Sequence, residues 1–386
     1  MSIYNSYTQD QLEEHFSNFI IKSWSFSKLN QYVRNEKAFE MIYIYGYQNK
    51  SAASGVSGNA YHLISDYWKA KQKGLTLSLP ELQEIAFKYI EEVPANKWKL
   101  QKTTPTMAEA KIKAIKTTTA LLSNFYKEKS KYEDHIAKIL DVELAITVYV
   151  TINGVDIPLP CNVVIDQVIE DHEGKVIIID HKSKNSFTSE EELRLSIGKQ
   201  GITYVKAYEA YTGRVVDEVW FCENKYSQNR SGEDQLSMFR VLLTEDTRAL
   251  YEDLLYENVK RLIEAVSNPD YVYLINDSDT LVDRAELYEF WAKTRITEID
   301  EFDIDYTDVN QEMIKKRHRK IRDSSTKMIT PKIIKQFKSN AASFIKYDLS
   351  TTDMTQENKI EHVLKTFGMQ TQVAHTLDGY SSNTYY

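Results

Sequence analysis

The stretch VVIDQVIEDHEGKVIIIDHKSKN, residues 163–185, decides the fold because it places charged side chains inside two strongly apolar runs. The DHEG segment at 171–174 between the runs has the composition of a tight turn. The two runs are therefore predicted to be antiparallel neighbours in a sheet. Asp180 and Lys182 are two residues apart on the second strand, so their side chains point to the same face.

A carboxylate on each strand suggests a chemical role for this pair. Asp166 lies on the first strand, and the turn can bring it close to Asp180. Two unpaired carboxylates at close range repel each other and are costly to desolvate, and a divalent cation between them would relieve both costs. Oxygen ligands favour Mg²⁺ or Mn²⁺.

Lys182 fits the same chemistry. An ammonium beside such a cation can orient an attacking water and offset negative charge that grows on a phosphate, which is what phosphodiester hydrolysis requires. On its own, however, an Asp-x-Lys at a strand end is frequent in proteins that have no such function.

The rest of the chain predicts helices on both sides of this sheet. Capping-box pairs such as Thr106 and Glu109, together with apolar periodicity, predict helices at 8–22, 27–45, 58–72, 80–92 and 106–133. Alternation and the Asn153-Gly154 turn signal predict a meander of strands at 142–151, 155–159, 162–170 and 175–183. A helix from about Thr188, a strand in VVDEVWFC (215–222) and a helix at 245–268 are predicted to follow.

Composition excludes several classes of protein. With 42% hydrophobic and 27% charged residues over 386 positions, the chain is of the globular type rather than disordered or fibrous. We find no apolar run of about 18 residues and no secretory signal, so we expect a cytoplasmic protein with no membrane partner. Cys161 and Cys222 provide no disulfide framework and no thiolate cluster, and we expect both to be buried.

The charge of the chain limits how it could bind nucleic acid. A net charge of −8 argues against binding through overall electrostatics, but it allows a local basic groove. Two basic groups are candidates: the lysines at 97, 99, 102, 111, 113 and 116, and KKRHRKIR at 315–322. An isolated charge run is more often a solvated helix face.

Five motifs, taken in order, resemble those of the PD-(D/E)XK nucleases, and within them the RecB-like branch of recombination exonucleases and CRISPR-adaptation nucleases. The motifs are GNAYH (Gly58–His62), Glu143 in VELAI, Asp166 in VVIDQV, Asp180-His181-Lys182, and QGITY (Gln200–Tyr204). The resemblance implies an α/β (α+β) fold with a restriction-endonuclease-like core, in which helices flank a central mixed sheet. The helical patterns of the sequence add a large helical N-terminal part and a mostly helical C-terminal extension.

The resemblance covers roughly residues 23–225, and the sequence as a whole predicts a division into domains. We expect a nuclease domain at 1–270, made of a helical part (1–135), a catalytic sheet and helix (140–225) and a packing helix (245–268). Residues 271–386 would form an extension that binds DNA or a partner protein.

The resemblance assigns site roles residue by residue. His62, Asp166, Asp180 and the backbone carbonyl of His181 would bind the metal, Lys182 would act with Asp166 and Asp180 in catalysis, Glu143 would assist, and Gln200 and Tyr204 would bind the substrate. Taken alone, His62 would be better explained as a hydrogen-bonded histidine at a helix edge, and Glu143 as an exposed strand residue. Gln200 lies on the apolar stripe of its helix, where a buried amide needs partners, although a purely structural hydrogen bond would also satisfy it.

Some features depart from the family pattern. Val163 stands where many RecB-like members have glycine, and the four cysteines of the iron–sulfur relatives are missing. There is no P-loop signature, so translocation along DNA would need a separate ATPase, and a helicase, recombinase or translocase is a candidate partner.

The sequence therefore predicts a Mg²⁺- or Mn²⁺-dependent DNA nuclease, and more narrowly an exonuclease of DNA recombination, repair or replication. Two alternatives stay open: a module of the same fold that binds nucleic acid without catalysis, and a structural subunit of a larger complex.

Overall fold

The structure is a computed structural model that describes most of the chain as far as residue 325. The described residues are 2–48, 50–189, 198–228, 232–276, 278, 279, 287, 290, 291, 293–295 and 297–325. They divide into two compact units. The first contains the residues up to Asn18, Lys22–Asn30 and Gln48–Glu264, and the second contains Phe19–Ile21, Gln31–Tyr47 and the described residues from Ala265 onward. Most of the predicted C-terminal extension lies outside the described residues.

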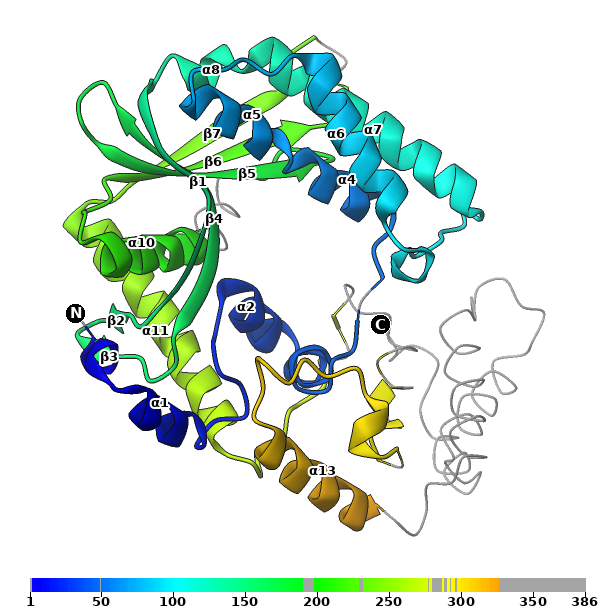
Figure 1. The fold of residues 1–386 in the computed structure, drawn as a ribbon, viewed down its shortest axis with the longest axis vertical. Coiled ribbons are helices and arrows are strands. Elements are labelled where there is room, and N and C mark those ends of the chain that lie inside the picture. Colours follow the sequence, from blue (N-terminus) through cyan, green and yellow to red (C-terminus); the bar gives the residue numbers. More distant parts are fainter. Residues whose placement is uncertain are drawn as a thin grey trace, which may run out of the picture. The chain divides into compact units, whose positions relative to one another are not determined.

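The first unit is built on a five-stranded mixed sheet with the order β1-β4-β5-β6-β7 (Figure 1). The strands are β1 (Ile136–Val148), β4 (Cys161–Asp171), β5 (Val176–Lys184), β6 (Glu218–Lys225) and β7 (Leu236–Leu242). Neighbouring strands are antiparallel except for β5 and β6, which are parallel. A parallel pair needs a crossover connection, and here the crossover contains helix α10 (Gly198–Thr212). The predicted central mixed sheet is confirmed.

The turn between β4 and β5 forms as the sequence predicted. The Asp171 carboxylate accepts hydrogen bonds from the backbone N–H groups of Glu173 (2.9 Å) and Lys175 (2.8 Å). Gly174 takes a left-handed conformation, with φ of 82°. The isoleucines at 177–179 that follow are fully buried, because helices cover both faces of the sheet at β5.

Two strand predictions were wrong in part. The Asn153-Gly154 turn exists, but it joins β2 (Thr151–Ile152) to β3 (Val155–Asp156), which form a separate two-stranded sheet rather than part of the meander. Strand β7 was missed, because its sequence LSMFRVL does not alternate cleanly between apolar and polar residues. Its pairing with β6 defines it as a strand, and a single sequence does not show that pairing.

Helices before β1 make up much of the first unit. They are η1 (Ile3–Ser6), α1 (Gln9–Phe16), α4 (Ala53–Tyr61), α5 (Ile64–Gln72), α6 (Leu79–Glu92), η3 (Ala95–Lys97), α7 (Met107–Glu128) and α8 (Ser130–Glu133). The predicted capping boxes at Thr8, Ser78 and Thr106 all form. The helix predicted at 58–72 is instead two helices, since α4 ends at Tyr61 and α5 begins at Ile64.

The helix predicted at 27–45 is also divided. It comprises α2 (Phe26–Arg34), α3 (Glu36–Phe39) and the π-helix η2 (Glu40–Ile44). Asn35 separates the first two, because its backbone is extended and its side-chain oxygen caps α3 by accepting a hydrogen bond from the N–H of Ala38.

Two helical layers cover the sheet (Figure 1). Helices α4 to α7 pack on one face, where Ile177 and Ile179 of β5 join a core with Trp68 and Phe125. Helix α10 lies on the other face and is tied to α11 (Glu245–Ser267) by the ion pair of Lys206 with Glu252. Because side chains alternate along β5, the even-numbered positions, which include Asp180 and Lys182, face the α10 side.

The second unit is held together by α13 (Gln311–Ser325), α3 and η2, with the short helix η5 (Ile299–Glu301). An isolated bridge joins Ile21 to Val309. Within the described residues, no helix combines the length and the apolar character that crossing a membrane requires. Cys161 and Cys222 are buried and form no disulfide, as the sequence predicted.

Candidate active site

The candidate site lies where strands β4 and β5 stop pairing. Their register ends at Gln167 opposite Ile179, and the next residue on each strand is a predicted metal ligand, Asp166 or Asp180. The Asp166 carboxylate accepts a hydrogen bond of 2.8 Å from the backbone N–H of His181. The Asp166 side chain thus replaces a backbone carbonyl as the acceptor for β5. Both carboxylates lie at the point where the two strands separate.

Asp180 is the most buried of the candidates, with 1% of its side chain exposed. The Nζ of Lys182 lies 3.0 Å from Oδ1 and 2.9 Å from Oδ2 of this carboxylate. From α10, Gln200 Nε2 donates to the same Oδ1 at 3.2 Å and to the Tyr204 hydroxyl at 2.7 Å. Two separate motifs, Asp-x-Lys on β5 and Gln-x-x-x-Tyr on α10, therefore meet at one buried carboxylate.

Burial governs the charge states of this cluster. It raises the pKa of Asp180 to about 6, against the lowering effect of Lys182 and with a further raising effect from Asp166. Burial would lower the pKa of Lys182, but the Asp180 charge outweighs it and the pKa lies above its usual value. Burial raises the pKa of Asp166, but His62 outweighs it and the pKa is lowered overall.

His62 follows the last residue of α4 and lies beside Asp166, with 3.6 Å between Nδ1 and Oδ2. Burial would lower its pKa, but Asp166 raises it overall. Gly58 explains how α4 comes so close to β5, because an added Cβ at this position would lie 2.9 Å from Oγ of Ser183. These two residues of GNAYH therefore do different things: the glycine lets α4 approach β5, and the histidine lies beside Asp166.

The His181 side chain lies on the opposite face of β5 from Asp180. Its ring stacks on Trp68, with 6.3 Å between ring centroids, and its Nε2 lies 3.2 Å from Oε1 of Gln167. Burial lowers the pKa of His181 to about 4, so the ring is neutral at ordinary pH. The imidazole therefore belongs to the core, and the metal-binding role of the backbone carbonyl stays a prediction.

The Glu143 carboxylate is not joined to the other candidates. Its neighbours Val142 and Leu144 pair with the two residues that flank Asp166, so Glu143 lies alongside Asp166 in register. Its backbone, however, has φ of 51°, and its half-exposed carboxylate forms an ion pair with Lys69 of α5. Its assisting role stays a prediction.

Glu223 on β6 belongs to the same region and was missed from the sequence. It pairs in register with Lys182 and is 2% exposed. Its carboxylate accepts hydrogen bonds from the backbone N–H of Thr188 (2.8 Å) and from the Thr188 hydroxyl, and Lys184 Nζ lies 3.5 Å away. Glu223 holds the chain that follows β5. The sequence feature that could have indicated Glu223 is its position directly after the apolar run VWFC.

The carboxylates fit a divalent cation in their chemistry. Among the described residues, no group of three or more His, Cys, Asp and Glu side chains is arranged to hold a metal ion. Oδ2 of Asp180 is nevertheless buried and accepts no hydrogen bond, although Lys182 Nζ is near. A buried carboxylate oxygen with an ion-pair contact but no hydrogen bond, next to a second carboxylate, suits a hard cation that keeps several waters and takes one or two protein carboxylates.

Comparison with known proteins gives one family match. The family model described as PD-(D/E)XK nuclease superfamily matches residues 23–305 of the chain. No curated protein matches.

Solved structures give more distant likenesses. A candidate exonuclease from Eubacterium rectale is 12% identical with a TM-score of 0.43, over 72% of this chain and 92% of that one. An alkaline exonuclease from Laribacter hongkongensis is 14% identical with a TM-score of 0.24, over 56% of this chain and 90% of that one. A structure of LHK-Exo in complex with dAMP is 16% identical with a TM-score of 0.21, over 53% and 89%. At these values the likenesses assign neither activity nor substrate.

Proposed function

Because this chain belongs to the PD-(D/E)XK nuclease superfamily, we propose that it is a metal-dependent DNA nuclease, acting as an exonuclease, with its site at the separated ends of β4 and β5. Membership of the superfamily supports a phosphodiester hydrolase. The substrate, the metal and the mode of cleavage belong to the proposal.

The observation that carries the proposal is the convergence of Lys182 and Gln200 on Oδ1 of Asp180. A buried aspartate that served only the fold would be costly to keep charged. Here Lys182 of the same strand and the amide of Gln200 on α10 both bind this carboxylate. Such an arrangement is expected where the charge is needed for chemistry.

Asp166 and Asp180 are proposed to hold the cation, with His62 and the backbone carbonyl of His181. When bound, Mg²⁺ or Mn²⁺ would supply a Lewis acid that polarises the scissile phosphate. Oδ2 of Asp180, which accepts no hydrogen bond and has the Lys182 ammonium 2.9 Å away, supports this role.

The other side chains have roles of their own. Lys182 places a positive charge where it can orient the attacking water and stabilise a phosphate that gains negative charge. Gln200 fixes the orientation of Asp180 and, with Tyr204, is proposed to bind the substrate strand. The neutral His181 ring packs on Trp68, on the face of β5 opposite Asp180.

The wider biological role follows from the RecB-like resemblance. We propose DNA recombination, repair or replication as the setting, in the cytoplasm, with DNA as the main partner. A helicase, recombinase or translocase partner is a further proposal. The alternative is a module that binds nucleic acid without cleaving it, and it would keep the same fold and the same buried aspartate.

Linear and closed-circular DNA test the exonuclease mode. With Mg²⁺ or Mn²⁺, the protein is expected to shorten end-labelled linear DNA, single- or double-stranded, and to leave closed circles of the same sequence intact, because an exonuclease needs an end. Gel electrophoresis over time measures both.

Each other outcome has a distinct meaning. Cutting of closed circles would contradict the exonuclease mode and leave the nuclease assignment standing. Failure of the folded protein to cleave any of these substrates would favour the binding module.

A further inference from the structure

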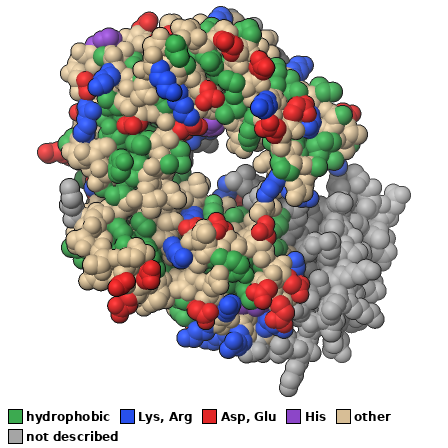
Figure 2. Space-filling model, in the orientation of Figure 1, with side chains coloured by type: hydrophobic (Ala, Val, Ile, Leu, Met, Phe, Trp, Pro, Cys, Tyr) green, Lys and Arg blue, Asp and Glu red, His purple; other side chains and the backbone are tan. Residues whose placement is uncertain are grey.

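Helix α13 of the second unit carries a concentration of positive charge. Six of its residues between 315 and 322 are Lys or Arg, in a chain whose net charge is −8. Figure 2 shows Lys and Arg side chains gathered over this helix. They divide into a buried set and an exposed set, which have different roles.

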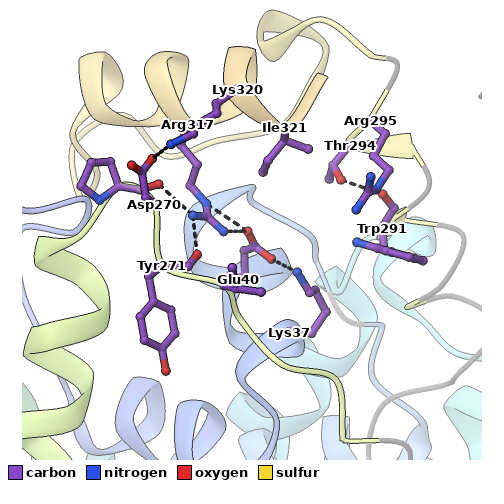
Figure 3. A pocket seen from close by; sticks show the side chains of 12 residues that line it. Lys37, Glu40, Asp270, Tyr271, Trp291, Thr294, Arg295, Arg317, Lys320 and Ile321 are labelled. Atoms are coloured by element: carbon purple, nitrogen blue, oxygen red, sulfur yellow. Dashed lines mark hydrogen bonds and ion pairs between the residues drawn. The ribbon is translucent and has the colours of Figure 1, made fainter. Parts of the chain in front are cut away.

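The inward face fixes the helix in the second unit. Arg317 is 6% exposed, and its guanidinium binds Glu40 and donates to the backbone carbonyls of Pro269 (2.9 Å) and Tyr271 (2.7 Å) (Figure 3). His318 on the same side is buried, with Nε2 2.6 Å from the carbonyl oxygen of Thr297. The orientation of α13 is therefore set, and its opposite face must point outward.

The cavity beside this buried pair is lined in part by cations that already have carboxylate partners. It has a volume of about 250 Å³, and its cations include Lys37, Arg317 and Lys320 (Figure 3). Lys37 and Arg317 both bind Glu40, and Lys320 binds Asp270. Each of these three cations therefore has a carboxylate partner inside the unit, although Lys37 and Arg317 share the same one.

The outward face leaves cations without a partner. Lys316, Arg319 and Lys320 are exposed, and within the described part of the chain neither Lys316 nor Arg319 forms an ion pair. Lys316 and Lys320 are four residues apart, as are Lys315 and Arg319. Lys315 pairs with Glu312 and Lys320 with Asp270, so Lys316 and Arg319 are the cations of this face that remain for an external anion among the described residues.

The geometry of the face suits a phosphate backbone. Four residues of α-helix rise about 6 Å, and a DNA strand carries one phosphate per about 3.4 Å of helix axis. The face from Lys316 to Lys320 can thus meet about two phosphates. Among the α13 residues whose side chains are described, none of the large apolar ones is exposed, which argues against insertion into a membrane surface.

We propose that Lys316 and Arg319 on the outward face of α13 bind the phosphate backbone of the DNA substrate without reading its sequence. The inference rests on the proposed function in naming DNA as the ligand. It adds a binding surface in the second unit, made of residues that take no part in the catalytic cluster.

The double variant Lys316→Glu/Arg319→Glu tests this surface. A matched control is Lys127→Glu/Lys260→Glu, on α7 and α11, because these lysines are also exposed, lie outside both basic groups and form no ion pairs within the described residues. Binding of fluorescein-labelled single- and double-stranded oligonucleotides is measured by anisotropy with the full chain in EDTA, at several salt concentrations. Circular dichroism checks that each variant is folded.

The α13 variant is expected to weaken binding of the duplex at least about tenfold and to reduce its salt dependence by about two phosphate contacts, because each neutralised phosphate contributes a slope of about −0.9. The Lys127→Glu/Lys260→Glu control should change affinity less than about twofold. Lys316→Gln/Arg319→Gln should give an intermediate loss, since it removes the charges without reversing them.

Equal affinity for the α13 variant and the wild type would overturn the proposal, and so would equal losses in the α13 variant and the Lys127→Glu/Lys260→Glu control. Wild type that binds no oligonucleotide overturns it as well. A cleavage assay on the same samples tests the nuclease function separately from the DNA-binding surface of α13. If wild type cleaves DNA and the α13 variant binds normally, only the surface is refuted. If wild type binds through α13 but never cleaves, only the nuclease function is refuted.

Discussion

Replacing Lys182 with alanine is expected to lower the rate constant for DNA cleavage by about 10²–10³, the usual cost of removing one group that stabilises charge in a transition state. The Lys182 ammonium contacts both oxygens of Asp180, at 3.0 and 2.9 Å. Binding of the DNA itself should change little, because the loss falls on the chemical step. Single-turnover cleavage of end-labelled DNA and anisotropy of the labelled strand in EDTA measure the two effects separately.

Lys175→Ala is the matched control for this variant. Lys175 directly precedes β5, is 43% exposed and pairs with Glu173, so its removal should leave cleavage within about twofold of wild type, as for most surface substitutions. The catalytic role of Lys182 would be refuted if Lys182→Ala cleaved as fast as Lys175→Ala. A loss of folding in Lys182→Ala, seen in its unfolding curve, would point instead to a structural role.

Replacing Arg317 with methionine is expected to lower the free energy of unfolding by about 3–5 kcal/mol, since removing one partner of a buried ion pair leaves the other charge uncompensated. Glu40 is 1% exposed, and Lys37 would be its one remaining cation among the described residues. The carbonyls of Pro269 and Tyr271 would also lose their donor. Urea unfolding followed by circular dichroism measures the loss.

Arg319→Met provides the comparison within the same helix. Arg319 is exposed, so the same chemical change should cost less than about 0.5 kcal/mol. The double variant Arg317→Met/Glu40→Gln should recover part of the loss, because the uncompensated charge is gone. If Arg317→Met and Arg319→Met unfold at the same urea concentration, the Arg317–Glu40 pair does not hold the second unit together.

The sequence predicted those parts of the fold that are encoded locally. The DHEG turn, the capping boxes and helix α6, found at Leu79–Glu92 against a predicted 80–92, depend on residues close together in the chain. Strand β7 and the Arg317–Glu40 pair depend on tertiary contacts. The two residues of that pair are 277 positions apart, and nothing local to either one reveals its partner.

The candidate site shows the same division. A spacing of two residues placed Asp180 and Lys182 on one face, and the helical stripe singled out Gln200, which does bind Asp180. The Lys69 partner of Glu143 and the buried Glu223 could not be predicted in this way. Lys69 lies on a separate helix, α5, and the depth of Glu223 follows from β6 being covered on both sides by other elements.

Metal-dependent cleavage by wild type and Asp180→Asn tests the central claim most directly. End-labelled linear DNA is incubated with Mg²⁺, Mn²⁺ or EDTA, and the asparagine variant keeps the shape of the buried side chain while removing its charge. We predict cleavage by wild type with Mg²⁺ or Mn²⁺, none in EDTA, and at least about a 10³-fold loss in folded Asp180→Asn. Cleavage that persists in EDTA, or an Asp180→Asn variant as active as wild type, would contradict a metal-dependent site built on Asp180.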